Sequence, residues 1–129
     1  MATILALTGE LGSGKTELTR SLLRVLGVKG RVTSPTFTLI RKYKLSARTP
    51  FKLAFHIDCY RLKKPEELLM LGFREIIENP EHLVIIEWPE LMKKYIPSRS
   101  TVKISLSHGS PRSRFGEAGK KQNERIIRF

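Results

Sequence analysis

The residues best suited to chemistry form one segment near the start of the chain, Gly9-Glu10-Leu11-Gly12-Ser13-Gly14-Lys15-Thr16. The segment fits the pattern G-x-x-x-x-G-K-[ST] at every fixed position. Its glycines let backbone N–H groups turn toward phosphate oxygens, and the helix expected to follow adds its positive end. In such loops the lysine reaches the β- and γ-phosphates, while the hydroxyl ligates Mg²⁺. The sequence therefore predicts that Gly9–Thr16 binds ATP with Mg²⁺.

A phosphate loop of this kind also needs a carboxylate at the end of a neighbouring buried strand, to hold Mg²⁺ or its water shell. Glu87 directly follows the apolar run Leu83–Ile86, which is typical of a strand buried on both faces. The alternative is a glutamate at a strand end that simply reaches water. We therefore expect Glu87 to face the loop as a metal ligand.

A second group of polar side chains alternates along an apolar stretch. His56, Asp58 and Tyr60 share one face if this stretch is extended. A histidine, a carboxylate and a phenol together can position water or metal, although an exposed polar sheet face shows the same alternation. His82 and His108 have no obvious companions, and we expect them to be structural.

The elements that position these residues follow from apolar spacing and turn signals. Ala2–Thr8 predicts a strand before the loop, and leucines at helical spacing predict a helix over Glu17–Leu26 after it. Phe37–Leu45 and Phe51–Tyr60 predict a hairpin. Further expected elements are a helix that starts at Pro65 and is interrupted by Gly72, helices over Phe73–Glu78 and Pro89–Tyr95, and strands over Leu83–Ile86, Thr101–Ser107 and Arg125–Phe129. This alternation predicts an α/β three-layer sandwich whose mixed sheet includes an antiparallel hairpin. Together with the loop at Gly9–Thr16, it predicts a P-loop NTPase sandwich.

The length of 129 residues predicts a single domain over 1–129, with a flexible basic loop near 107–122. The net charge of +12 is uneven, because 41–64 has 8 basic and 1 acidic side chains, 65–92 has 1 and 7, and 93–129 has 10 and 2. Such asymmetry favours an acidic or nucleic-acid partner, with solubility alone as the alternative. The sequence has no run of apolar residues long enough for a membrane helix. The single cysteine, Cys59, excludes an intramolecular disulfide, so we expect a cytoplasmic protein.

Thr33-Ser34-Pro35-Thr36 follows the first helix, where P-loop proteins often carry a switch whose hydroxyls meet Mg²⁺ or the γ-phosphate. Four motifs thus stand in order: GELGSGKT, TSPTFTL, HIDCYRL and IIEWPE. Taken together they resemble the TsaE family, the ATPase of bacterial tRNA threonylcarbamoyladenosine synthesis. The resemblance extends from Thr3 to about Tyr95.

The resemblance implies a P-loop ATPase that resets a two-protein threonylcarbamoyl-transferase complex, with tRNA reached through that complex. It implies Thr16 and Glu87 as Mg²⁺ ligands, and Asp58 as the residue that positions or activates the attacking water. It also implies that Thr36 serves the switch-like loop and that Trp88 shapes the wall of the site. The family has an upstream segment that helps to cover the adenine, whereas this sequence starts at the strand. We therefore expect slow hydrolysis by the isolated chain.

Other functions fit the same phosphate loop. A small-molecule kinase would use Arg112 and Arg114 as lid arginines, although nothing marks an acceptor site. A GTPase would carry an Asn-Lys-x-Asp segment, which is absent. A non-catalytic nucleotide-binding module that interacts with RNA would also be basic.

Overall fold

The computed structural model describes residues 1–10, 12, 14–32, 39–108 and 125–128. A six-stranded mixed sheet, with strand order β2-β3-β4-β1-β5-β6, forms the middle of the molecule. β1, β3, β4 and β5 run parallel, whereas β2 is antiparallel to β3 and β6 is antiparallel to β5. The strands are β1 (Thr3–Thr8), β2 (Ile40–Lys44), β3 (Leu53–Asp58), β4 (His82–Glu87), β5 (Thr101–His108) and β6 (Arg125–Arg128). The predicted hairpin is thus confirmed as β2–β3.

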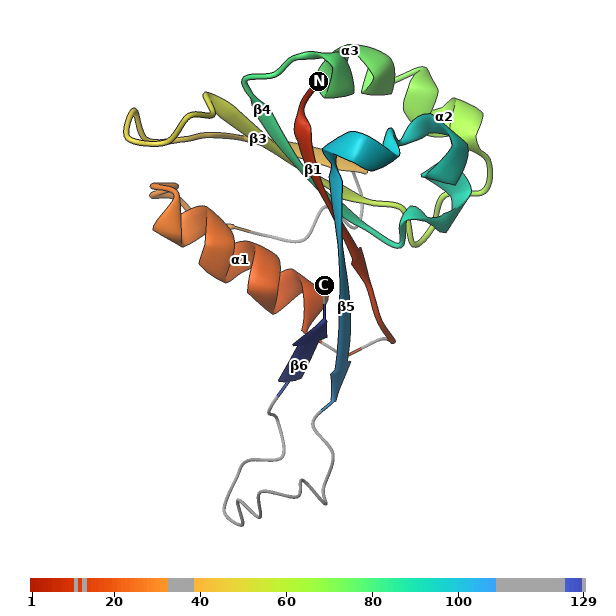
Figure 1. The fold of residues 1–129 in the computed structure, drawn as a ribbon, viewed down its shortest axis with the longest axis horizontal. Helices are drawn as coiled ribbons and strands as arrows, with labels where there is room; N and C mark the ends of the chain where they lie inside the picture. Colours follow the sequence, from red (N-terminus) through yellow and green to blue (C-terminus); the bar gives the residue numbers. More distant parts are fainter. Residues whose placement is uncertain (11, 13, 33–38, 109–124, 129) are drawn as a thin grey trace.

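Helices cover both faces of the sheet, as Figure 1 shows, with α1 on one side and α2 and α3 on the other. The α-helices are α1 (Lys15–Val25), α2 (Pro65–Leu69) and α3 (Phe73–Glu78), and the 3-10 helices are η1 (Pro89–Tyr95) and η2 (Ser98–Ser100). The predicted three-layer α/β arrangement is therefore confirmed. None of the helices in the described ranges combines the length and apolar character that crossing a membrane requires.

Two apolar cores flank the sheet, because residues of each strand alternate between its faces. In β4, Leu83 and Ile85 pack on the α1 side, whereas Val84 and Ile86 pack on the side of α2 and α3. This explains why the sequence of β4 is continuously apolar rather than alternating. The polar end of such a strand, Glu87, is consequently held at the carboxyl edge of the sheet.

The element boundaries differ from the predicted ones mainly at strand ends. β3 ends at Asp58, so Tyr60 lies beyond the strand in a turn. β5 continues through His108, because Ser107 and His108 pair with β6. The remainder of the loop expected near 107–122 lies outside the described residues.

Candidate nucleotide site

The loop between β1 and α1 follows a path that requires glycine. Gly9, Gly12 and Gly14 have φ angles of 147°, 78° and 101°, in the region that side chains other than glycine rarely adopt. Gly14 directly precedes the first helical residue, Lys15. The strand and helix required around the motif are therefore present. Leu11 and Ser13, which we predicted to contact nucleotide, lie outside the described residues.

Lys15 is folded back over its own loop. Its Nζ donates hydrogen bonds to the carbonyl oxygens of Gly9 at 2.6 Å and Glu10 at 3.0 Å. The same atom lies 4.3 Å from the ring centroid of Trp88. Burial lowers the pKa of the Lys15 ammonium, and the negative charge of Glu87 opposes this shift. A cation is thus held where the loop would meet phosphate.

Glu87 lies at the point where β4 meets the loop. The register pairs Glu87 with Leu7 of β1, two residues before Gly9. Glu87 is only 3% exposed, so the alternative of a glutamate that reaches water is wrong. The hydroxyl of Thr16 lies 3.4 Å from Glu87 Oε2, the distance of a long hydrogen bond. The structure therefore brings the two predicted metal ligands together.

His56 is the principal partner of Glu87, a contact that the sequence analysis missed. His56 Nε2 lies 2.6 Å from Glu87 Oε2, and the imidazole is fully buried. The alternative of an exposed polar face is therefore wrong for this residue. Its position two residues before Asp58 indicated that the two side chains share a face of β3. Only the pairing of β3 with β4 shows that the carboxylate it meets is Glu87.

Asp58 ends β3 directly beside Glu87, its register partner on β4. It is half-buried, and its Oδ1 accepts a hydrogen bond of 3.0 Å from the backbone N–H of Tyr60. Burial raises the pKa of the Asp58 carboxyl above its ordinary value, the Tyr60 bond opposes this, and the charge of Glu87 raises it further. Asp58 is thus a carboxylate of raised basicity beside the loop.

Trp88 and Tyr60 form an aromatic wall at this edge. Their ring centroids are 5.0 Å apart, and the Tyr60 side chain is 51% exposed. The φ angle of Trp88 is 57°, which is rare for a bulky residue and common at functional sites. The predicted His56, Asp58 and Tyr60 face is therefore divided, since His56 is buried against Glu87 while Tyr60 turns to Trp88. Thr36 lies outside the described residues.

The oxygen ligands present suit Mg²⁺. A P-loop Mg²⁺ takes one hydroxyl, a carboxylate directly or through water, and phosphate oxygens. Thr16 and Glu87 provide the first two. Within the ranges that the structure describes, no group of three or more His, Cys, Asp or Glu side chains could hold a metal by themselves. The arrangement fits an ion that arrives with its nucleotide.

Of the two histidines that we expected to be structural, only His82 has a described side chain. His82, at the start of β4, is hydrogen-bonded through Nδ1 to the carbonyl of Ile76 at 2.9 Å, and its ring contacts Phe55. It is therefore structural, far along β4 from Glu87. The side chain of His108 is outside the described part of the chain.

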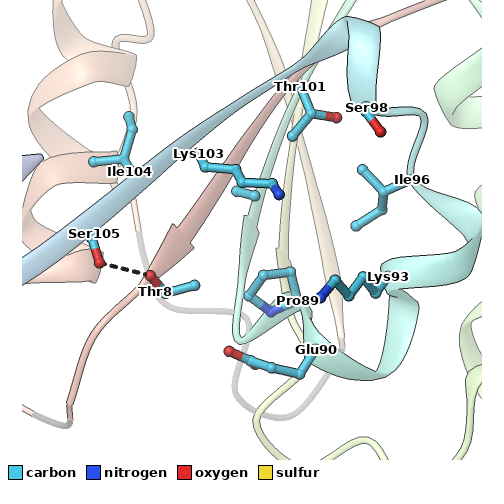
Figure 2. Close-up of a pocket in the computed structure, with 11 residues that line it drawn as sticks. Thr8, Pro89, Glu90, Lys93, Ile96, Ser98, Thr101, Lys103, Ile104 and Ser105 are labelled. Atoms are coloured by element: carbon cyan, nitrogen blue, oxygen red, sulfur yellow. Dashed lines mark hydrogen bonds between the residues drawn. The ribbon is translucent and has the colours of Figure 1, made fainter. Parts of the chain in front are cut away.

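A cleft of about 590 Å³ lies on the face of the sheet opposite α1, between β1, β5 and η1 (Figure 2). It adjoins the loop, because Thr8 precedes Gly9 and Pro89 follows Trp88. None of Lys15, Asp58 and Glu87 lines it, so it is separate from the candidate catalytic groups. Its lining residues are Ala6, Thr8, Pro89, Glu90, Lys93, Ile96, Ser98, Thr101, Lys103, Ile104 and Ser105.

We expect Asp58→Asn to stabilise the nucleotide-free protein. Because the folded-state pKa of Asp58 is raised, its ionised form opposes folding above that pKa, and the cost disappears below the ordinary value of 3.8. Asparagine removes the charge and keeps an oxygen for the Tyr60 N–H. Thermal unfolding should show a Tm a few degrees above that of the parent at neutral pH, with the gain shrinking on acidification. The exposed Glu78→Gln is the control, and a lower Tm for Asp58→Asn would contradict this account.

The parallel strands, the glycine loop that leads into α1 and the carboxylate at the end of the adjacent strand define the class of P-loop proteins, whose members bind nucleotides. A family model described as "Threonylcarbamoyl adenosine biosynthesis protein TsaE" matches residues 1–115. The chain belongs to the TsaE family.

Curated relatives agree with this assignment. The chain is 41% identical over 96 residues to the tRNA threonylcarbamoyladenosine biosynthesis protein TsaE of Haemophilus influenzae, covering 74% of this chain and 58% of the relative. It is 39% identical over 117 residues to the protein of the same name from a Nostoc species, covering 88% and 68%. Several of the relatives are therefore matched over only half to two thirds of their length.

A solved structure also resembles this fold. The crystal structure of Bacillus subtilis YdiB aligns with a TM-score of 0.64 and 25% sequence identity, covering 84% of this chain and 62% of that one. The similarity supports the α/β fold of the chain.

Proposed function

We propose that this protein is a Mg²⁺-dependent ATPase of tRNA N6-threonylcarbamoyladenosine synthesis. The observation that carries the proposal is the convergence of Lys15, Thr16 and Glu87 at the carboxyl edge of the sheet. The names of the curated relatives support the pathway. We place the whole of residues 1–129 in one functional domain.

The proposed division of labour follows the chemistry of each side chain. Backbone N–H groups of the loop and Lys15 bind the phosphates, and Thr16 and Glu87 hold Mg²⁺, which neutralises charge on the γ-phosphate when bound. Asp58 orients the attacking water and accepts its proton, a role that its raised pKa favours. Trp88 forms a wall of the site and Thr36 acts in the switch loop.

The proposed partner is the two-protein threonylcarbamoyl-transferase complex, which this ATPase resets between turnovers. Exposed basic side chains suit it for docking to acidic surfaces. On β2 these are Arg41, Lys42 and Lys44, and on η1 they are Lys93 and Lys94. Transition-state charge in P-loop enzymes is often completed by a partner that orders the switch or contributes an arginine.

We expect the purified transferase pair to stimulate slow ATP hydrolysis by this chain, and the stimulation to weaken at high salt because salt screens exposed charges. The measurement is the steady-state ATPase rate with and without the pair, at low and high salt. A triple charge reversal at Arg41, Lys42 and Lys44 should reduce the stimulation and leave the basal rate intact. Reversal of Lys29, a lysine on the loop after α1, serves as the control. Rapid hydrolysis that the pair does not change would overturn the proposal.

A further inference from the structure

The clearest unexplained feature of the site is the buried imidazole of His56. Its Nε2 is hydrogen-bonded to Glu87. We propose that His56 is a positioning residue, which holds the Glu87 carboxylate in the orientation that Mg²⁺ requires. This inference rests on the proposed binding of ATP with Mg²⁺.

The strand register sets the geometry of this contact. Asp58 pairs with Glu87 and His56 pairs with Ile85, so His56 lies two residues deeper in the sheet than the carboxylate it meets. His56 lies on the same face of β3 as Ala54, which packs in the core on the α1 side. Glu87 lies on the same face of β4 as Ile85, which belongs to that core, and its Oε2 lies near both His56 and Thr16. The imidazole therefore contacts the carboxylate from the interior of the sheet, and the carboxyl edge of the sheet lies on the other side of the carboxylate.

The hydrogen bond from His56 is the stronger of the two at Glu87 Oε2. Its length is 2.6 Å, whereas the Thr16 hydroxyl lies 3.4 Å from the same oxygen. A glutamate that is 3% exposed has lost most of its water, so its carboxylate needs such a donor. Because a carboxylate oxygen can only accept a hydrogen bond, Nε2 is the donor to an ionised Glu87.

Packing alone does not explain a histidine at this position. His56 Nδ1 is buried and has no hydrogen-bond partner among the described residues. An unpaired buried polar atom costs free energy, and an aliphatic side chain would fill the space without that cost. Of the two ring nitrogens, only Nε2 has a hydrogen-bond partner among the described residues, and that partner is Glu87.

Without His56, the carboxylate has a competing attraction. The negative charge of Glu87 acts on the Lys15 ammonium, which is already partly desolvated. A Glu87 side chain released from His56 would turn toward this charge. Such a pair would occupy both the metal ligand and the lysine that the phosphates need. His56 thus keeps the two groups available for their separate tasks.

The test compares His56→Leu, which removes the donor, with His56→Gln, whose amide N–H reaches about as far as Nε2. Titrating Mg²⁺ into the protein with ADP, and following the fluorescence of Trp88, the single tryptophan, measures metal affinity without turnover. Loss of a partner that orients a metal ligand typically weakens metal binding by roughly 10–100-fold. We expect a loss of this size for His56→Leu, with most of the affinity recovered in His56→Gln.

The control is His82→Leu, which removes another histidine from the same sheet. It should lower the Tm and leave Mg²⁺ affinity unchanged. In a Glu87→Gln background, His56→Leu should cause no further loss of Mg²⁺ affinity, because the ligand that it positions is already neutral. If His56→Leu does not fold, His56→Asn, with a shorter side chain, takes its place.

Two results would overturn the inference. Mg²⁺ affinity in folded His56→Leu equal to that of the parent would show that Glu87 needs no such support. If His56→Leu weakens Mg²⁺ binding equally in the parent and in the Glu87→Gln background, His56 does not act through the Glu87 carboxylate. If the parent protein itself shows no Mg²⁺-dependent ADP binding, the proposed function is wrong. This result distinguishes failure of the proposed function from failure of the inference about His56.

Discussion

Lys15→Ala should lower ATP hydrolysis by roughly 10²–10³-fold, the loss typical when one donor to developing transition-state charge is removed. Lys15 is 5% exposed, and its ammonium already donates to two carbonyl oxygens of its own loop. These bonds position the charge beside the path of the phosphates before nucleotide binds. Alanine removes the charge and leaves the glycine backbone of the loop unchanged.

The measurement for Lys15→Ala is the steady-state ATPase rate in the presence of the transferase pair, where the proposed function predicts the highest parent rate. Lys29→Ala, in the exposed loop after α1, removes an equal charge outside the site and should keep the parent rate. Circular dichroism and thermal unfolding establish that both variants fold. A Lys15→Ala protein with the parent rate would refute the assignment of Gly9–Thr16 as the phosphate loop.

Glu87→Gln should mainly weaken Mg²⁺ binding, whereas Asp58→Asn should mainly slow the hydrolysis step. Glu87 is the buried carboxylate beside Thr16, so its neutralisation should weaken Mg²⁺ binding beyond the roughly 10–100-fold typical for loss of an outer partner. Asp58 is half-buried with a raised pKa, as suits a base. Its neutralisation should slow hydrolysis by about 10²–10⁴-fold at saturating Mg²⁺.

Mg²⁺ titrations of ADP binding and single-turnover hydrolysis of ATP, performed on both variants, test this division. Glu78→Gln, on the exposed side of α3, removes a carboxylate outside the site and should change neither quantity. If Asp58→Asn alone loses the metal response, the two carboxylates have the opposite roles. Because Asp58→Asn is expected to be more stable than the parent, a slower rate cannot be attributed to unfolding.

Much of the site was predictable because its signals are local. The glycines and Lys15 belong to one short loop, whose spacing follows from the geometry of binding phosphate through backbone N–H groups. Glu87 ends an apolar run, and burial on both faces of a parallel strand explains that run without reference to any other segment. The same reasoning predicted the alternation of strands and helices, and hence the three layers.

Contacts between strands were not predictable in this way. The separation in sequence is 31 residues between His56 and Glu87 and 71 residues between Thr16 and Glu87. These side chains meet because β4 lies between β3 and β1, with Glu87 in register with Asp58 on one side and Leu7 on the other. A shift of β3 by one residue would turn His56 to the opposite face of the sheet.

Local signatures in the sequence therefore predict a phosphate loop and two candidate carboxylates. Only the folded chain shows that His56 meets Glu87, and that Tyr60 leaves the face shared by His56 and Asp58 to contact Trp88. These contacts depend on strand order and register, which are set by how both apolar cores pack together. No short segment of the chain contains that information.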